Sequence, residues 1–180
     1  VWTNEAKYFT PYAQELLKRR GELPPESDVI EYAQRVLELN KLYEFGGENL
    51  LIVGTDEPVY TTLLPGFAYH RELYAMVHAG LPNIAVLKAA TINGAKALGV
   101  ADKIGSIESG KLADILVIKG NPLEDIKATR NIKLIIKGGV IHHPEVLLQS
   151  AEGKIGPQGP GDHEAWELHV EPLRPASLQP

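Results

Sequence analysis

Asp56 is the residue of this sequence whose position most clearly suggests chemistry. It follows the apolar run LLIVG at residues 50–54 after a single threonine, and Pro58 comes two residues later. A carboxylate at the end of a buried strand is costly unless it is paired or binds a metal. Such a group can bind a divalent metal, accept a proton from the attacking water and pass that proton to the leaving group. The alternative is a turn aspartate satisfied by backbone N–H groups, and the residues alone leave these two interpretations equal.

The six histidines give weaker signals. His70 follows the loop after Asp56 and could bind a substrate, although a packed or hydrogen-bonded helix histidine is the simpler interpretation. His142 and His143 are adjacent on an expected strand, so their side chains point to opposite faces and make a poor chelate. The histidines from which we expect no chemistry are His78, His163 and His169.

Two further polar residues invite a catalytic interpretation. Lys111 and Asp114 lie in the stretch SGKLADILV, residues 109–117. A tight turn followed by a strand explains both more simply, so we expect them to be structural. The loop over residues 57–67 follows Asp56 and could shape a substrate pocket.

Hydrophobic spacing and turn residues predict the elements that position these groups. Residues 12–21, 28–44 and 68–80 have helical spacing, and residues 82–99 predict two short helices with Thr91 as the N-cap of the second. The run at 50–54 is apolar on both faces, which is typical of a strand inside an α/β sheet. Past Gly99 the pattern predicts strands on either side of a turn at residues 108–111, and then a hairpin closed at Gly138–Gly139.

Composition narrows the classes of function. The chain of 180 residues has a net charge of −5, so nothing favours nucleic acid or an anionic membrane as a partner. It has no cysteine, which excludes disulfides and thiolate metal ligands and leaves the redox compartment open. No run of eighteen apolar residues could cross a bilayer. The sequence starts at Val1 with no signal-peptide pattern, so we expect a processing boundary there, with a cytoplasmic location favoured and secretion left open.

Five stretches, in this order and at these spacings, resemble the C-terminal part of the metal-dependent amidohydrolase superfamily, closest to its imidazolonepropionase-like and prolidase-like branch. The resemblance covers about residues 45 to 142. The matching stretches are GTD at 54–56, HRELYAMVHAGL at 70–81, AATINGAKALG at 89–99, GSIESGKLADILVIKGNPLEDI at 105–126 and IIKGGVI at 135–141.

The resemblance implies an α/β fold, namely the C-terminal part of a TIM-type (β/α)8 barrel plus a small β-sandwich module. The expected division is residues 1–99 for the last barrel strands and helices, 100–145 for the sandwich and 146–180 for a Gly/Pro-rich tail. Residues 50–56 would then be the eighth barrel strand, with Asp56 at its C-terminal end, where such barrels place their active sites.

The sequence departs from the family pattern in an important way. A barrel alone needs about 250 residues, and the family's early His-x-His metal motif does not occur among the six histidines. The mid-barrel ligands cannot be located either. The sequence therefore resembles the last part of an enzyme, and we expect the missing N-terminal part or a complementary chain as a partner.

The resemblance implies a metal-dependent hydrolase of a carbon–nitrogen bond in an amide, a cyclic amide or a dipeptide. Its cofactor would be a divalent metal, for which zinc is expected, and Asp56 would be both catalytic and a metal ligand, with His70 a candidate for substrate binding. We also expect a homo-oligomer. Two alternatives stay open. Because zinc needs about three protein ligands, the chain could be a non-catalytic fragment or one half of a split enzyme. It could also be a binding module formed by the β part and the tail.

Overall fold

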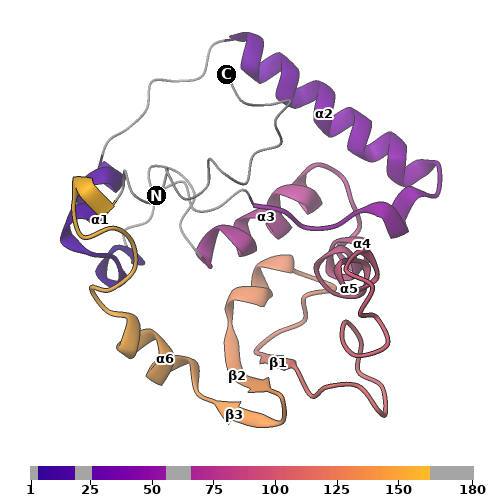
Figure 1. The fold of residues 1–180 in the computed structure, drawn as a ribbon. Helices are drawn as coiled ribbons and strands as arrows, with labels where there is room; N and C mark the ends of the chain where they lie inside the picture. The colour runs from indigo at the N-terminus through magenta and orange to yellow at the C-terminus, as the bar shows by residue number, and fades with distance from the viewer. Residues whose placement is uncertain (1–3, 19–25, 56–65, 163–180) are drawn as a thin grey trace. The chain divides into compact units, whose positions relative to one another are not determined.

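A computed structural model of the chain describes residues 4–18, 26–55 and 66–162 (Figure 1). The residues fall into two compact units. The smaller unit comprises Val1–Gly21, Val59–Thr62 and Leu148–Pro180, and the larger one Glu22–Pro58 and Leu63–Leu147. No helix in the described part of the chain is long and apolar enough to span a membrane.

In the smaller unit, residues 8–10 near the start of the chain are hydrogen-bonded to residues 154–157 near its end. Phe9 forms a parallel bridge with Ile155, and the backbone N–H of Thr10 donates to the carbonyl of Ile155 at 2.9 Å. The Thr10 hydroxyl donates to the carbonyl of Pro157, and Phe9, Thr10 and Ala13 are buried. Part of the Gly/Pro-rich segment is thus held by backbone hydrogen bonds to residues 8–10. The helices at this end are η1 (Ala6–Tyr8), α1 (Pro11–Lys18) and α6 (Pro144–Ala151), the last of which crosses the boundary between the units.

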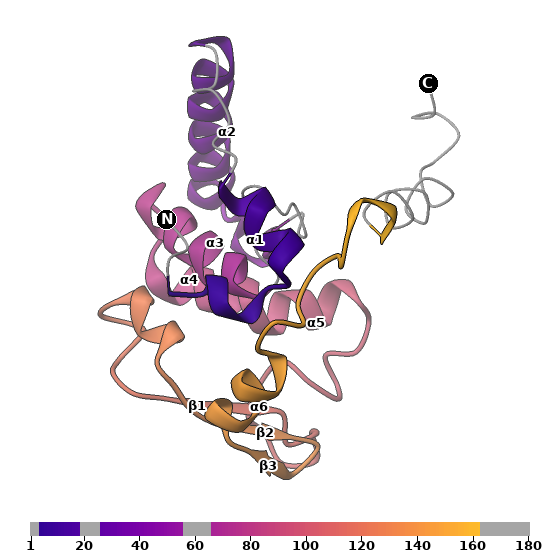
Figure 2. The ribbon, with the colours of Figure 1, turned by 90° about the vertical axis from the view of Figure 1, so that its left-hand side faces the viewer.

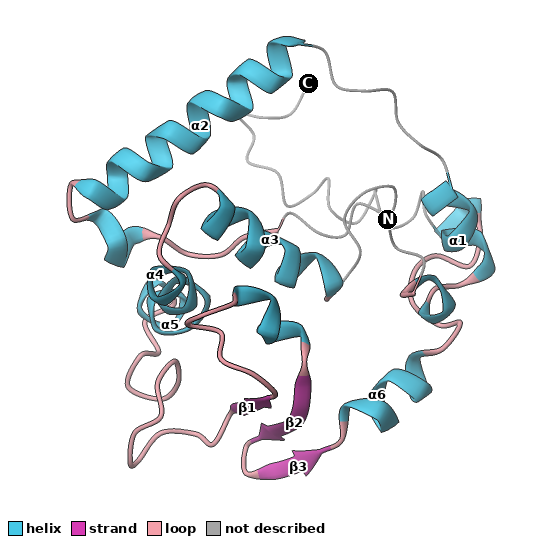
Figure 3. Ribbon diagram, turned by 180° about the vertical axis from the view of Figure 1, so that it is seen from behind, coloured by secondary structure: helices cyan, strands magenta, loops and turns pink. Residues whose placement is uncertain are grey.

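The larger unit consists of helices around one apolar cluster and a small sheet (Figure 3). The predicted helices over 28–44 and 68–80 are confirmed, and Gly80 follows the second in a left-handed conformation with φ of 109°. The helical elements are α2 (Glu26–Glu44), η2 (Gly47–Leu50), α3 (Phe67–His78), α4 (Asn83–Lys88), the π-helix η3 (Ala89–Asn93), α5 (Gly94–Ala97) and η4 (Ile126–Arg130).

The core of this unit is an apolar cluster between α3 and the elements packed against it. Its central side chains are Leu73 and Met76 of α3 and Val86 of α4, all buried. Leu51 and Ile126 join the cluster from segments that are far away in the sequence. Burying side chains of this size contributes about 1.5–3 kcal/mol each, so this cluster is the main stabilising feature of the unit.

Polar contacts fix the ends of these helices. The Asn40 amide of α2 donates to the carbonyl of Ala79, which terminates α3. Tyr69 donates from its hydroxyl to the carbonyl of Ala90 at 3.1 Å, and Asn83 donates to the carbonyl of Pro122 at 2.9 Å. Each bond links two elements that the apolar cluster already brings together, and so fixes the position of one element along the other.

The sheet has three antiparallel strands in the order β1-β2-β3 (Figure 2). The predicted hairpin is confirmed, because β2 and β3 are joined at Gly138–Gly139, where both glycines have positive φ. The side chain of Asp114 accepts from the backbone N–H of Gly138 at 2.7 Å and pairs with Lys137. The strands are β1 (Ile115–Ile118), β2 (Ile132–Lys137) and β3 (Val140–His142).

The prediction of a strand over residues 50–54 is wrong for the structure as described. Leu50 ends the short helix η2, and residues 51–55 carry no strand pairing within the described ranges. An apolar run becomes a strand only where a neighbouring strand accepts its backbone hydrogen bonds. Here the side-chain amide of Asn93 donates to the carbonyl of Leu51 in this run and to that of Glu48 just before it.

Two smaller predictions are also wrong. Thr91 is no N-cap: it lies inside η3 and its hydroxyl donates to the carbonyl of Leu87, so that residues 83–97 form one continuous helical stretch. The residues before the turn at 108–111 form no strand. Instead Gly105 packs against the helical stretch over 83–97. A Cβ atom at position 105 would lie 2.7 Å from the Cβ of Ala95.

Replacing Leu73 with alanine tests the importance of the apolar cluster. We expect the free energy of unfolding to fall by about 2–5 kcal/mol, because the substitution leaves a cavity among buried side chains. Urea unfolding of the purified chain measures this change. The control is Ile84→Ala on α4, where the side chain is 49% exposed, and its expected effect is within about 0.5 kcal/mol. Equal losses in the two variants would contradict the assignment of the core.

Candidate functional site

Asp56 lies outside the described residues, together with most of the loop over 57–67 that follows it. Its role as catalytic group and metal ligand therefore stays a prediction. The structure does describe the segment leading to it, residues 47–55, and the contacts that hold this segment.

Asn93 holds the segment that leads to Asp56. Its side-chain amide donates to the carbonyl of Glu48 at 2.8 Å and to that of Leu51 at 2.9 Å. The side chain is 2% exposed, and its Oδ1 atom is buried with no hydrogen-bond partner among the described atoms. A buried, unpaired oxygen is costly, so the two donated bonds are the interactions that keep this amide inside the unit. The amide thus replaces a missing backbone partner of the segment.

The π-helix η3 sets the position of Asn93. It spans Ala89–Asn93 between two α-helical pieces, and Ala89 and Asn93 are both buried. A π-turn inserts one extra residue and changes the face on which later side chains lie. Tyr69 fixes this turn by donating to Ala90, and the salt bridge between Lys88 and Glu48, at 3.7 Å, joins the start of the turn to η2.

His70 lies near the start of α3 and contacts η4. Its Nδ1 is 3.2 Å from the hydroxyl oxygen of Thr129, and that hydroxyl donates its only proton to the carbonyl of Ile126 at 2.8 Å. The proton between His70 and Thr129 must therefore be on Nδ1, which leaves Nε2 of the neutral ring as an acceptor. Binding of a substrate by His70 stays a prediction.

Burial lowers the pKa of His70, and the positive charge of Arg130 lowers it further. Glu72, two residues further along α3, has its pKa raised by burial. Both groups therefore favour their neutral forms more than they would in water.

His70 also lines an open cavity of about 590 Å³. One wall is α3, and the other is formed by the loop after β1 together with η4. The ring of Tyr74 is part of the first wall: it stacks on His78 with 5.8 Å between ring centroids, and the amino group of Lys127 lies 4.8 Å from its centroid. The other lining residues are Arg71, Lys119, Gly120, Asn121, Glu124, Asp125, Ala128, Arg130 and Asn131.

The described residues contain no group of three or more His, Asp or Glu side chains that could hold a metal ion. His142 ends β3, but His143 lies after the strand, so the prediction that both are on a strand is confirmed for His142 alone. His163 and His169 lie outside the described residues. Lys111 bonds with Glu108 at 3.2 Å across the turn, and Lys137 and the N–H of Gly138 lower the pKa of Asp114. These contacts agree with the structural interpretation of Lys111 and Asp114.

Comparison with known proteins assigns the chain to a family. Residues 38–142 match the profile of the Amidohydrolase family, and this chain belongs to that family. The imidazolonepropionase of Phocaeicola vulgatus is 35% identical over 105 residues, which are 54% of this chain and 25% of that protein. The 5-methylthioadenosine/S-adenosylhomocysteine deaminase of Teredinibacter turnerae is 41% identical over 61 residues, which are 34% of this chain and 14% of that protein.

Solved structures give the same assignment. A Xaa-Pro dipeptidase with methionine bound in its active site is 37% identical, with a TM-score of 0.51 over 60% of this chain and 25% of that one. An amidohydrolase is 26% identical, with a TM-score of 0.54 over 75% of this chain and 33% of that one. The chain therefore spans about a quarter of the length of that imidazolonepropionase and up to a third of these solved structures.

Sequence reasoning missed two features of this region. The burial of Asn93 could have been predicted from the sequence. It continues the stripe of Val86 and Ala89 at helical spacing and is the one polar residue of that stripe. The cavity could not have been predicted from a sequence pattern, since its walls come from residues 70–74 and 119–131 and no short motif joins them.

Replacing Asn93 with alanine removes both donors to the segment before Asp56. We expect a loss of about 1–3 kcal/mol in the free energy of unfolding, because buried carbonyls lose their partners. Amide hydrogen exchange in residues 50–55 should become faster than in α3. Asn49→Ala is the matched control, since Asn49 is exposed and only accepts from Lys96 at 3.5 Å. Unchanged exchange in residues 50–55 of Asn93→Ala would show that the amide does not hold this segment.

The environment of His70 predicts a pH dependence of stability. Its pKa in the folded protein is below the ordinary histidine value of 6.5, so on acidification the unfolded chain binds the proton first. The free energy of unfolding should therefore fall as the pH drops from about 6.5 towards the lowered pKa, and His70 should contribute no slope above that window. Urea unfolding in a phosphate-free buffer measures this slope.

The variant His70→Gln should show a flatter profile in that window, because the titrating group is gone. The control His143→Gln retains His70 and should keep the slope of the original chain. Identical profiles for His70→Gln and the original chain would mean that other groups cause the acid sensitivity.

Proposed function

We propose that this chain supplies the C-terminal part of a metal-dependent hydrolase that cleaves carbon–nitrogen bonds in amide, cyclic amide or dipeptide-like substrates. The observation that carries the proposal is membership of the Amidohydrolase family over residues 38–142. The printed names of relatives support it, since they include an imidazolonepropionase, an s-triazine hydrolase and a Xaa-Pro dipeptidase.

In this proposal Asp56 is the proton-transferring group and a metal ligand. A divalent metal, for which we propose zinc, supplies Lewis-acid chemistry in enzymes of this class. The described residues do not fit such a metal by themselves. We propose that the other ligands belong to the rest of a longer enzyme or to a complementary chain, in line with the quarter of the relative's length that this chain spans.

The fold proposed for the assembled enzyme is a TIM-type barrel completed by a small β-sandwich. Residues 1–99, 100–145 and 146–180 would be its last barrel elements, its sandwich strands and its tail. The sheet supports a complementary segment, because apolar side chains on one of its faces are exposed to solvent: Leu116 by 57% and Val140 by 59%. A second layer of strands would cover such side chains. The homo-oligomer and the cytoplasmic location expected from the sequence stay predictions.

The alternative is that the chain is non-catalytic, or is half of a split enzyme that acts only with its complement. The same exposed side chains of the sheet fit both alternatives, so they do not separate them. Metal content separates a hydrolase from a non-catalytic chain. A chain that binds no divalent metal, alone or with copurifying chains, cannot be the proposed hydrolase.

Asp56→Asn tests the proposal in the protein as it is isolated from its source, with any chain that copurifies. We expect hydrolysis of a panel of dipeptides and cyclic amides to fall by about 10²–10⁴-fold, because the amide cannot transfer the proton. Metal content is measured on the same samples.

Asp102→Asn is the control, since it makes the same change of charge at an exposed carboxylate and should leave both readouts unchanged. Full activity of Asp56→Asn would refute the assigned role. Absence of metal and activity from every preparation would favour the non-catalytic alternative.

A further inference from the structure

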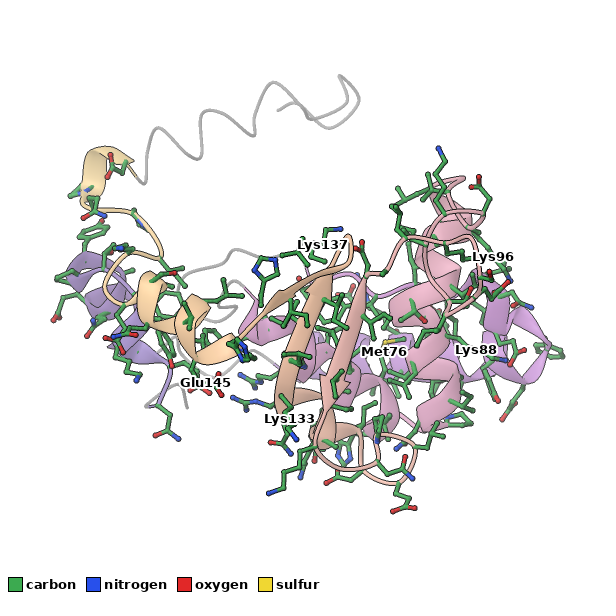
Figure 4. All side chains as sticks on the ribbon, turned by 90° about the horizontal axis from the view of Figure 1, so that it is seen from below. Met76, Lys88, Lys96, Lys133, Lys137 and Glu145 are labelled. Carbon is green, nitrogen blue, oxygen red and sulfur yellow. The ribbon has the colours of Figure 1, made fainter. Side chains whose placement is uncertain are left out.

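Two segments of the smaller unit lie on either side of the region that matches the Amidohydrolase family, and they are bonded to each other. The family match covers residues 38–142. Residues 7–10 come before this region and residues 153–157 come after it. Figure 4 shows the two segments side by side, in faint indigo and faint yellow. Membership of the family does not account for this contact.

The contact is a short piece of parallel backbone pairing. The backbone N–H of Thr10 donates to the carbonyl of Ile155 at 2.9 Å, and that of Ile155 donates to the carbonyl of Tyr8 at 3.0 Å. On one side of this pair, the backbone N–H of Gly153 donates to the carbonyl of Lys7 at 3.0 Å. Residues 153–157 therefore form a strap that is hydrogen-bonded along residues 7–10.

Glycine and proline give the strap its shape. Gly153 has φ of 68° and Gly156 has φ of 97°, which is the left-handed conformation that residues with a Cβ take only at a cost. Pro157 is buried, and its carbonyl accepts from the Thr10 hydroxyl. The residues that make this stretch rich in Gly and Pro thus have definite structural roles.

The strap also supports α1. This helix has eight residues, and isolated helices shorter than about 12–15 residues are marginal in water. The Thr10 hydroxyl accepts from the backbone N–H of Ala13 at 3.2 Å, as the side chain of an N-cap does. The same hydroxyl donates to Pro157 of the strap. The residue that caps α1 is therefore held in place by the strap.

Few side chains stabilise this contact. Phe9, Thr10 and Ala13 are buried. The ion pair between Lys7 and Glu152, at 3.2 Å, joins side chains that are 60% and 49% exposed, and exposed pairs contribute little. Regions with few buried apolar contacts open at lower free energy than the core of a protein. We therefore expect the strap to open before the apolar cluster around α3 does.

We propose that the strap is a conformational device that controls α1. Residues 153–157 close on residues 7–10, and α1 is helical only while they are closed. When the strap opens, the larger unit stays folded, and the segment before the family region loses its helix. This inference goes beyond the hydrolase proposal, because it uses none of the residues assigned to the reaction and its test needs no substrate.

Amide hydrogen exchange of the original chain, followed by NMR, measures the opening. The reporters are the amides of Thr10 and Ile155, which donate across the contact, and that of Gln14, which donates to the carbonyl of Thr10 in α1 at 2.9 Å. We expect all three to show one common free energy of opening. They should also exchange at least about tenfold faster than the slowest amides of α3.

The test variant is Gly153→Ala with Gly156→Ala, which strains the closed strap at both left-handed positions. The three reporter amides should exchange at least about tenfold faster than in the original chain, with those of α3 unchanged within about twofold.

Gly159→Ala with Gly161→Ala is the matched control. It makes the same chemical change nearby in the chain, at positions whose φ is outside the left-handed range. An added Cβ there would meet nothing within 4 Å among the described atoms. Exchange of the reporters should stay within about twofold of the original chain.

Three results would overturn the proposal. One is equal acceleration by the two glycine pairs, and another is a Gln14 amide that stays protected when Thr10 and Ile155 lose protection. The third is found in the original chain: if Thr10 and Ile155 are unprotected, or open only together with α3, no separate strap exists. This last measurement decides the question even if the test variant does not fold.

Discussion

The packing of α3 against three separate parts of the chain is the constraint on which the larger unit depends. Leu73 and Met76 bring together the end of η2, the helical stretch over 83–97 and η4, which is more than 45 residues further along the chain than α3. The polar contacts of Asn93 and His70 are built on this packing. Asn93 reaches the segment before Asp56 because its helix packs on that core, and His70 reaches Thr129 because η4 does so.

Sequence patterns predicted the helices well because helix formation is local. The spacing of apolar residues in 28–44 and 68–80 gives one buried stripe, and such a stripe has few alternatives. The Gly138–Gly139 turn was equally clear, since only glycine readily takes positive φ at two successive positions. The run at 50–54 could not be decided locally, because a short apolar segment becomes a strand only if another strand lies beside it.

The candidate site was predictable only in part, for the same reason. The resemblance placed Asp56 at the end of that run, and the structure does not describe it. Asn93 was within reach, as the single polar residue of a buried stripe, but its partners at 48 and 51 are a consequence of tertiary packing. The pairing of His70 with Thr129 crosses 59 residues, and no spacing rule reaches that far.

The sheet and the cavity differ in what they require from other parts of the protein. Leu116, Val140 and Ile141 expose apolar surface, and apolar surface of this kind commonly marks a contact with another layer or chain. The hydrolase proposal and its non-catalytic alternative both depend on what supplies that layer. The cavity between α3 and η4 does not share this dependence, because its two walls are joined within one unit by the contact of His70 with Thr129.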